Sequence, residues 1–360
     1  MREFLADLDR AGKLHRVKKS VDRSWEPASL VKWMYQALPD DRRFGLYFER
    51  VEGTSIPLVT AALGASTASY ALALGVEPDA INETLLAALR NRVAPRVVTG
   101  APAQEVVMLG EAAHLGRLPI PVWTPGKDAG PYISTMVATR SADGGAANMG
   151  IYRTQVLDAR KVAVNLSPGR QGTRSVRSHH AANAPAPIAW VIAPEPACYL
   201  AAVANLPYGQ HEIDFAGGLL GRPIELVQAK TVDLLVPANA EIVIEGEILP
   251  DETATEGPFG EFAGYMSSPA ERPVARITAI THRRDPIYYG LSSQMPPSES
   301  TVLQSLTNAA IVLKVLRDDY GDPNIHDAYV DLMFGGVLAH GIVAMAPQYP
   351  GHAKRIGRLV

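Results

Sequence analysis

The chain has 360 residues, 47% apolar and 20% charged, which is typical of an ordinary globular protein with two or three domains. Its 34 basic and 37 acidic residues give a formal net charge of −3. This balance argues against a nucleic-acid partner, because such partners need a basic face. The single cysteine, Cys198, excludes an internal disulfide and a metal site built from several thiolates.

Two segments bear on location. The first residues, Met1 to Asp9, lack the apolar region of a signal peptide. The uncharged span from Ser55 to Val76 is long enough to cross a bilayer, but it contains a proline, three serines, two threonines and two glycines. We therefore predict a buried strand, a loop and a helix there, and a cytoplasmic protein without a membrane partner.

The first hundred residues alternate predicted helices with predicted strands. Phe4, Leu5 and Leu8 form one apolar stripe, and Gly12 follows as a stop signal. We predict helices over 2–11, 25–38 and 78–91, and strands over 45–51 and 56–60. This alternation favours an N-terminal α/β domain over residues 1–110.

The pattern changes after a proline-rich transition over 105–124. Short β-branched runs bounded by turns predict strands over 136–140, 152–157, 161–166, 188–192, 224–228, 234–237, 242–246, 274–280 and 287–289. A polar helix or loop interrupts them over 171–186. Many short strands at close spacing indicate a barrel or sandwich, so we place a central β-domain over 111–300.

The helical pattern returns after Ser300. We predict a helix over 301–316, strands over 328–333 and 341–346, and the opening of another helix over 355–360. Residues 301–360 are thus expected to begin a C-terminal α/β domain. The expected fold class is α+β.

The most informative stretch is Glu256-Gly-Pro-Phe-Gly-Glu261. Glycine and proline break both the helical and the strand period, so the chain can turn and bring the two carboxylates together. Two carboxylates in one site push their pKa values apart, and one can then stay protonated near neutral pH. The alternative is a surface turn with two solvated acids.

Three further segments carry chemistry in the same indirect way. Asn148 precedes a glycine and a strand that leads to Arg153, which is typical of a hard-metal or phosphate contact, or of a simple turn. Glu212 is either a charge at a helix N-terminus or a metal ligand. Lys354 follows a Pro-Gly turn, as a phosphate clamp or a solvated helix start would.

Taken in order, Asn148-Met-Gly-Ile-Tyr-Arg153, the Glu-x-x-Phe-Ala-Gly of 212–217, Glu256-Gly-Pro-Phe-Gly-Glu261 and Tyr349-Pro-Gly-His-Ala-Lys354 resemble the UbiD family of decarboxylases, which use prenylated FMN. The resemblance implies an N-terminal α/β domain, a central split β-barrel that binds the flavin, and a C-terminal α/β domain for oligomerisation. It also implies a flavin prenyltransferase as the cofactor supplier and a homo-oligomer.

The resemblance also implies roles for individual residues. Asn148 and Glu212 would bind a divalent metal, Mn²⁺ or Mg²⁺, that holds the flavin phosphate together with K⁺. Arg153, Glu256 and Glu261 would form the catalytic ionic network, and Lys354 would approach the cofactor phosphate. The residues expected around the cofactor are Asn148, Met149, Gly150, Ile151, Tyr152, Arg153, Gln171, Glu212 and Lys354.

The sequence departs from the family pattern in two places. The family's third metal ligand is a histidine shortly after the strand that follows the arginine, but residues 165–171 contain none. Gln171, His179 and His180 are the alternatives for this ligand. Family members also continue well beyond Lys354, whereas this chain ends six residues later, so we expect a truncated C-terminal domain.

These observations predict a reversible, non-oxidative decarboxylase of an aromatic or α,β-unsaturated carboxylic acid. Arg153 would hold the substrate carboxylate and keep Glu256 ionised. Glu261 would protonate the carbon that loses CO₂, and an apolar setting near Phe259 and Phe262 would make it the less solvated acid. The alternatives are a flavin-reductase-type oxidoreductase on the same barrel and a non-catalytic flavin-binding or assembly subunit.

Overall fold

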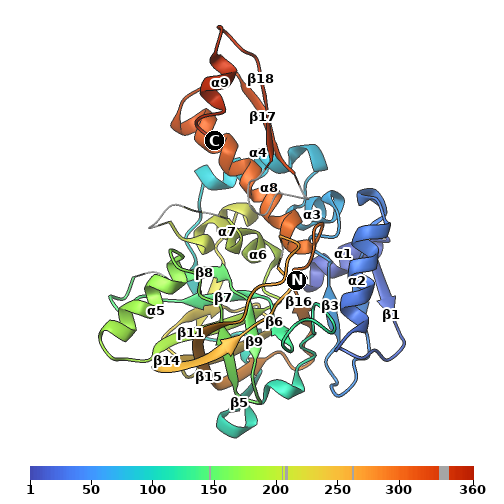
Figure 1. Ribbon diagram of the computed structural model, residues 1–360, viewed down its shortest axis with the longest axis vertical. Coiled ribbons are helices and arrows are strands. Elements are labelled where there is room, and N and C mark those ends of the chain that lie inside the picture. The colour runs from blue at the N-terminus through green and yellow to red at the C-terminus, as the bar shows by residue number, and fades with distance from the viewer. Residues whose placement is uncertain (146, 205, 207–209, 262, 332–339) are drawn as a thin grey trace.

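The computed structural model describes residues 1–145, 147–204, 206, 210–261, 263–331 and 340–360. Phe262, and residues 332–333 of a predicted strand, lie outside the described residues. The fold is α+β, as predicted, with a curled antiparallel sheet in its middle and helices packed around it (Figure 1). No helix in the part of the chain that the structure describes is long and apolar enough to span a bilayer.

The N-terminal segment packs helices on a four-stranded sheet. Helix α1 (Arg2–Arg10) buries Phe4, Leu5 and Leu8, as its apolar stripe predicts. The other helices here are α2 (Glu26–Ala37), α3 (Thr67–Leu74) and α4 (Ile81–Arg90). The sheet runs β1 (Leu14–Val17), β2 (Gly45–Phe48), β3 (Leu58–Thr60) and β16 (Tyr288–Gly290).

Strand β16 corrects one prediction, because the strand expected over 287–289 does not belong to the central sheet. It pairs in parallel with β3 instead, and Tyr288 and Tyr289 are buried there. A short apolar run shows that a strand is buried but does not show which sheet it joins. The N-terminal sheet is therefore completed by residues more than two hundred positions later in the chain.

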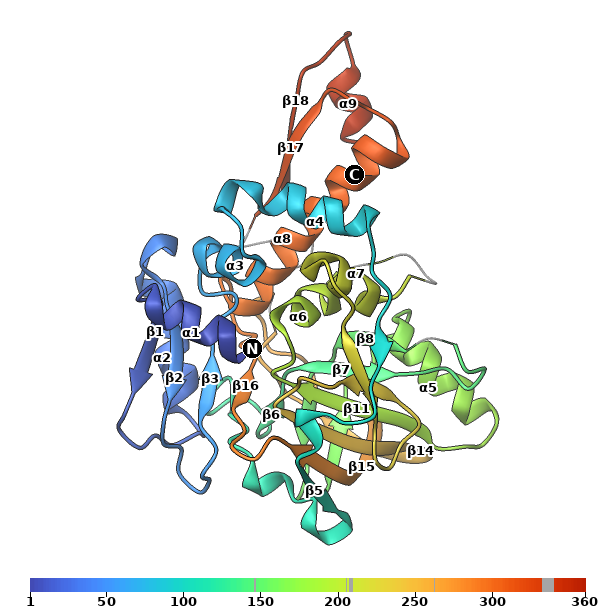
Figure 2. The same ribbon diagram turned by 180° about the vertical axis from the view of Figure 1, so that it is seen from behind.

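The central sheet has nine strands, and every pair in it is antiparallel. It curls into a half-barrel whose path begins at β6 and ends at β8 (Figure 2). In spatial order the strands are β6 (Tyr132–Ile133), β9 (Thr154–Val156), β10 (Lys161–Val164), β15 (Ala270–His282), β14 (Ile242–Glu256), β11 (Ala186–Ile192), β7 (Met136–Thr139) and β8 (Asn148–Ile151), with β5 (Val106–Leu109) paired to β15.

Two predicted barrel strands lie elsewhere. Strands β12 (Glu225–Gln228) and β13 (Leu235–Pro237) form a hairpin that pairs with β4 (Arg96–Val97) in a separate three-stranded sheet. The prediction that 224–228 and 234–237 belong to the barrel is therefore wrong. A hairpin satisfies its own backbone hydrogen bonds, so local pattern alone cannot place it in a larger sheet.

Helices cover one end of the central sheet. Helix α5 (Gln171–Ala181) contacts β7, β8 and β11, and α6 (Pro196–Ala202) and α7 (Glu212–Leu220) pack on each other and on β8. Both views show α6 and α7 between the sheet and the pair formed by α4 and α8 (Glu299–Lys314) (Figures 1 and 2). This arrangement brings the N-terminus of α7 next to β8.

The C-terminal segment begins with α8, close to the helix predicted over 301–316. Strands β17 (Ile325–Val330) and β18 (Gly341–Met345) form an antiparallel hairpin, near the two predicted strands. Helix α9 (His352–Ile356) starts three residues before the predicted helix and ends where that helix was expected to begin, because Gly351 turns the chain with φ of 91°. The division of the chain at residues 110 and 300 stays a prediction.

Candidate active site

The structure brings together the three residues predicted to form the ionic network. Arg153 lies between β8 and β9, Glu256 is the last residue of β14, and Glu261 follows five residues later. Arg153 Nε and Nη2 donate to Glu256 Oε1 and Oε2 at 2.9 and 3.0 Å. Its Nη1 contacts Glu261 Oε1, so one guanidinium joins both carboxyl groups.

The two carboxyl groups differ in exposure, and in the opposite sense to the prediction. The Glu256 side chain is fully buried, whereas 29% of the Glu261 side chain is exposed. The expectation that Glu261 is the less solvated acid is therefore wrong. Glu256 is the last residue of β14, a strand of the central sheet, while Glu261 lies in the segment after this strand and is partly exposed.

Further groups support the arginine and its buried partner. Burial alone would lower the pKa of Arg153, but the hydrogen bonds of Glu256 and the charge of Glu261 raise it. The guanidinium carbon lies 5.3 Å from the ring centroid of Phe259, which adds a cation–π contact. A second arginine, Arg272, approaches Glu256 Oε2 with its Nε at 3.9 Å. Glu256 therefore faces two cations in a buried setting.

The turn between the carboxylates is tied down at its backbone. Gly257 N–H donates to Gln155 Oε1 at 2.9 Å, and Gly260 N–H donates to Asp128 Oδ1 at 2.8 Å. Between them, Phe259 N–H donates to the Ser267 hydroxyl at 3.0 Å. Pro258 has no N–H, and the other three N–H groups from 257 to 260 all have partners. These hydrogen bonds hold the turn in a defined shape.

Tyr132 joins the network without having been predicted. Its hydroxyl lies 3.1 Å from Glu256 Oε1 and 3.2 Å from Gln155 Oε1, and its ring packs on Phe259 at a centroid distance of 4.4 Å. Tyr132 is fully buried in a small cluster formed by Ala28, Trp123, Tyr132 and Phe259. No motif in the sequence marked Tyr132, because its link to Glu256 spans 124 positions.

A second group of predicted residues gathers around the end of β8. Asn148 is buried, and its Nδ2 donates to the Tyr152 hydroxyl at 3.2 Å. Met149 N–H donates to Glu212 Oε2 at 3.1 Å, so the first residue of α7 reaches the same strand. Burial raises the pKa of Glu212 to about 7. A buried carboxylate beside an amide oxygen is a donor set suited to a hard divalent cation.

The three candidates for the third metal ligand lie in different surroundings. Gln171 opens α5, and the next residue, Gly172, donates its N–H to the Tyr152 hydroxyl at 3.2 Å. His179 and His180 instead place Nε2 at 3.0 and 3.2 Å from the backbone carbonyls of Arg140 and Ile248. Within the described residues no three His, Cys, Asp or Glu side chains gather into a metal site. Gln171 is thus the alternative whose neighbour in the chain, Gly172, bonds to Tyr152.

Gly150 and Gly172 make room for the Tyr152 ring. A Cβ at either glycine would lie within 3.0 Å of the Tyr152 hydroxyl. Tyr152 therefore packs between two backbone segments that approach closely because neither has a side chain. Ile151, the remaining predicted contact on β8, is half-buried.

Lys354 does not join these residues. It is exposed on α9, which lies at the top of both views, whereas β8 lies in the lower half (Figures 1 and 2). The predicted approach of Lys354 to the cofactor phosphate is therefore not part of this arrangement.

The site has polar groups that a bound cofactor could satisfy. Asn165 Oδ1 is buried and accepts no hydrogen bond within the described residues, and Asn165 N–H donates to the Arg153 carbonyl. Buried acceptors usually have a partner, so this oxygen marks a place for a donor. Together with Asn148 and Glu212 it fits a polar cofactor held through a hard metal.

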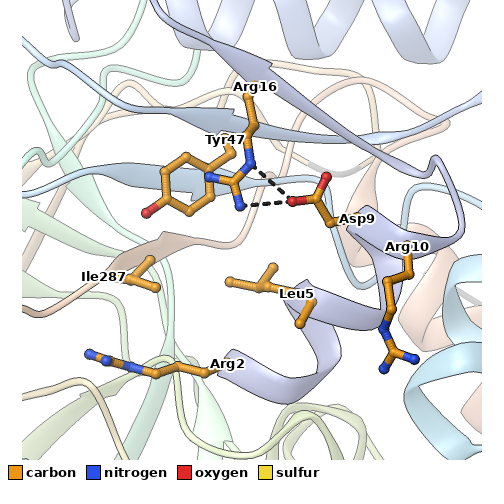
Figure 3. Close-up of a pocket in the computed structure, with 8 residues that line it drawn as sticks. Arg2, Leu5, Asp9, Arg10, Arg16, Tyr47 and Ile287 are labelled. Carbon is orange, nitrogen blue, oxygen red and sulfur yellow. Dashed lines mark hydrogen bonds and ion pairs between the residues drawn. The ribbon is translucent and has the colours of Figure 1, made fainter.

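A separate surface pocket of about 570 Å³ lies on the N-terminal segment and does not contain any of these residues (Figure 3). Its charged groups are already paired: Arg16 Nη2 donates to Asp9 at 2.9 Å, and Arg2 Nε donates to Glu241 at 2.7 Å. We assign this pocket no part in the site. It is lined by Arg2, Leu5, Ala6, Asp9, Arg10, Arg16, Tyr47 and Ile287.

Comparison with known proteins identifies the fold and the family. Residues 95–296 match the 3-octaprenyl-4-hydroxybenzoate carboxy-lyase Rift-related domain of the UbiD family, and residues 5–89 match the N-terminal domain of that carboxy-lyase. The first match alone covers more than half of the chain. The first of these regions contains the Arg153 cluster and the central sheet, and the second contains the N-terminal segment with α1 to α4.

Several solved structures share this architecture. An evolved dimeric form of the UbiD-class enzyme HmfF from Pelotomaculum thermopropionicum, in complex with prFMN, is 35% identical, with 99% of this chain and 81% of that chain covered and a TM-score of 0.91. Vanillic acid decarboxylase from Sedimentibacter hydroxybenzoicus is 30% identical, with 99% of this chain and 76% of that chain covered and a TM-score of 0.90. 3,4-Dihydroxybenzoic acid decarboxylase from Enterobacter cloacae is 26% identical, with 99% of this chain and 78% of that chain covered and a TM-score of 0.89.

The resemblance seen in the sequence motifs is thereby confirmed by two family matches and by solved structures that cover nearly the whole chain. The chain belongs to the UbiD family, and it is a carboxy-lyase of that family.

Proposed function

We propose that this chain catalyses the reversible, non-oxidative decarboxylation of an aromatic or α,β-unsaturated carboxylic acid with prenylated FMN as cofactor. The observation that carries the proposal is the single guanidinium of Arg153 between the carboxyl groups of Glu256 and Glu261. The similar proteins support it, because HmfF was solved with prFMN and two others act on aromatic acids.

The cofactor would be held at the end of β8. Asn148 and Glu212 would bind Mn²⁺ or Mg²⁺, with Gln171 as the third protein ligand, and this metal with K⁺ would hold the flavin phosphate. The backbone of Met149, Gly150 and Ile151 would face the cofactor. When bound, the prenylated flavin supplies the electron sink that cleavage of the C–CO₂ bond requires. Lys354 would need a different placement of α9 to take part.

The charges at Arg153 define how the acid binds. Arg153 and Arg272 would balance the charges of ionised Glu256 and Glu261 before substrate arrives, so a substrate carboxylate would add one uncompensated negative charge. A substrate carboxylate would be a third anion, and like charges at such short range repel strongly. A proton on Glu261 removes this repulsion, and Nη1 of Arg153 can then turn from Glu261 to the substrate. Substrate binding therefore favours a protonated Glu261.

Glu256 and Glu261 would then divide the chemistry. Glu256 would hold the guanidinium in place, because both of its oxygens accept hydrogen bonds from Arg153. Glu261 holds the proton on Oε2, since Oε1 faces Arg153. After the C–CO₂ bond breaks and CO₂ leaves, the Glu261 proton moves to the carbon that carried the carboxylate, and the electron pair of the broken bond forms the new C–H bond. In the reverse direction the Glu261 carboxylate takes this proton back.

Three kinds of partner follow from this activity. A small carboxylic acid is the substrate, a flavin prenyltransferase supplies the cofactor, and a second copy of this chain forms a homo-oligomer. The family match and the network both favour a decarboxylase over the alternatives of a flavin reductase and a non-catalytic flavin-binding subunit.

The deciding experiment is co-expression with a flavin prenyltransferase, followed by a CO₂-release assay on a panel of aromatic and α,β-unsaturated acids. Protein prepared with plain FMN is the matched control, and NADH oxidation is measured in parallel. We expect CO₂ release with prenylated FMN only, and exchange of labelled bicarbonate into the acid. NADH oxidation without CO₂ release would support the reductase alternative and overturn the proposal.

A further inference from the structure

The turn that carries Glu261 rests on one carboxylate from a distant loop. Asp128 accepts from Gly260 N–H with Oδ1 at 2.8 Å and from Thr124 N–H with Oδ2 at 2.7 Å. Both carboxylate oxygens are therefore engaged, one on each chain segment. The neighbouring Ala129 N–H also donates to the Pro258 carbonyl at 2.9 Å. The 124–129 loop and the 257–261 turn are thus bonded to each other at two points.

The same two segments also touch without space between them. A Cβ built on Gly260 would overlap Thr124 Oγ1 and lie 3.2 Å from Thr124 Cβ. Movement of the Gly260 backbone toward Thr124 would therefore produce a clash, and movement away from Asp128 would break a hydrogen bond. Because Glu261 follows Gly260 directly, fixing the Gly260 backbone also fixes where the Glu261 side chain starts relative to Arg153.

Tyr132 plays the corresponding part for the other carboxyl group. Its hydroxyl lies between Glu256 Oε1 and Gln155 Oε1, and Gln155 Oε1 also accepts from Gly257 N–H. The ring of Tyr132 is fully buried against Phe259 and Trp123, so the hydroxyl has little freedom to leave. Glu256 Oε1 thus accepts hydrogen bonds from both the Tyr132 hydroxyl and Arg153 Nε.

We infer that Asp128 and Tyr132 are positioning residues of the reaction. Asp128 fixes Gly260 and with it the proton-carrying carboxyl group of Glu261, and Tyr132 fixes the Glu256 carboxylate against Arg153. This inference rests on the proposed function. Neither residue is required to touch the acid, so their loss should affect the rate of proton transfer more than the binding of substrate or flavin.

Two substitutions test this with little change of shape. Asp128→Asn turns one acceptor into a donor, so either Thr124 N–H or Gly260 N–H must face an NH₂ group. Asp158→Asn is the matched control: Asp158 is exposed and accepts from Arg160 N–H and Lys161 N–H with the same oxygen, which an amide can replace. Tyr132→Phe removes only the hydroxyl, and Tyr329→Phe is its exposed control.

Four quantities are measured on the flavin-loaded protein: kcat, KM, flavin content, and deuterium exchange of the peptide that spans 256–261. We expect kcat to fall by about 10- to 100-fold in Asp128→Asn and by about tenfold in Tyr132→Phe, since small displacements of a catalytic group cost rates of this order. KM and flavin content should change less than about twofold, which a general loss of structure would not allow. Exchange at 256–261 should be faster in Asp128→Asn only.

The outcomes separate the two proposals. An active wild type with unchanged kcat in both variants would overturn the positioning role. So would an equal loss in Asp158→Asn, or a fall in kcat that only follows the loss of flavin. A wild type that decarboxylates no acid would overturn the proposed function instead. The exchange measurement then still decides whether the turn depends on Asp128, and unchanged exchange would overturn that too.

Discussion

Glu261 meets Arg153 through one carboxylate oxygen, whereas Glu256 meets it through two. The more exposed and less tightly held group is the better proton carrier, because it can gain and lose a proton without breaking a buried pair. Glu261→Gln keeps the size and polarity of the side chain but removes the proton. We expect turnover to fall by roughly 10²–10⁴-fold, as for other general acids, with flavin binding unchanged.

This result would be read from kcat in the CO₂-release assay and from flavin absorbance after desalting. The control is Glu111→Gln, at a glutamate whose side chain is 95% exposed and remote from the network. Full turnover in Glu261→Gln would assign the proton to another group.

Asn148 should affect the cofactor before it affects the chemistry. Its amide is buried beside Tyr152 and next to the residue whose N–H holds Glu212. Asn148→Ala removes a hard-metal ligand, so we expect loss of bound metal and flavin. Elemental analysis and flavin absorbance would show this. Asn91→Ala is the control, because Asn91 is exposed and its side chain, among the residues that the structure describes, donates to the Ala87 carbonyl of its own helix. Retention of both metal and flavin by Asn148→Ala would remove Asn148 from the cofactor site.

The identity of the network residues could be predicted from the sequence, but their exposure could not. The order of the motifs was enough to select Arg153, Glu256 and Glu261, which the fold brings together from three separate segments. It could not rank their exposure, because burial depends on which residue ends a strand and which lies on the turn. Asp128 was missed for a related reason: its role depends on a contact across 132 positions, and its own neighbourhood resembles any polar turn.

At the scale of elements, the turn over 257–261 is a unit whose shape depends on a missing side chain. Gly260→Ala would push Thr124 Oγ1 aside, and overpacking of this kind costs typically about 1–3 kcal/mol. We expect turnover to fall by about 100-fold, since the displaced neighbour is Glu261. Thr124→Ala removes the overlapping oxygen and leaves a Cβ contact of 3.2 Å, so the double variant should recover part of the rate.

This double-variant cycle is measured by kcat and by the free energy of unfolding. Gly100→Ala is the matched control, because a Cβ there meets no atom within 4 Å. Strictly additive losses in the double variant would show that Gly260 and Thr124 do not act through their contact.

Element boundaries show the same limit of local pattern. A strand was predicted over 242–246, but β14 continues to Glu256 because its polar second half pairs with β15. Alternating polar residues offered no apolar run to detect, yet this extension is what carries Glu256 to Arg153. In contrast, α1 and α8 were predicted well, since an apolar stripe at helical spacing is a local property.

At the scale of the whole molecule, Glu299 joins segments that are far apart in the chain. It is the first residue of α8, and it is fully buried. Its carboxylate accepts hydrogen bonds from two segments, one before α3 and one around β16. The donors are the N–H groups of Ala61, Leu63, Gly64 and Ser292 and the hydroxyl of Tyr289. This junction could not be predicted, because no motif marks a glutamate of which three donors lie over two hundred residues away.

Burial raises the pKa of Glu299 above its ordinary value of 4.5, although its hydrogen bonds oppose this. The folded protein then binds a proton at a pH where the unfolded chain has lost it. Stability from this group is therefore fully present below about pH 4.5 and is lost as pH rises through the folded pKa. The loss is about 1.4 kcal/mol for every tenfold difference in proton affinity between the folded and unfolded states. Glu299→Gln cannot titrate, so its free energy of unfolding lacks this dependence.

We expect Glu299→Gln to be less stable at every pH, since an amide cannot accept from all five donors. The free energy of unfolding of the wild type minus that of the variant should be largest at the acid end and should shrink as pH rises. Urea unfolding between about pH 4 and 8 would measure it, because other groups titrate alike in both proteins and cancel. The exposed Glu77→Gln should show no such slope. A difference that grows with pH would mean that the five hydrogen bonds outweigh burial and keep Glu299 ionised in the folded protein.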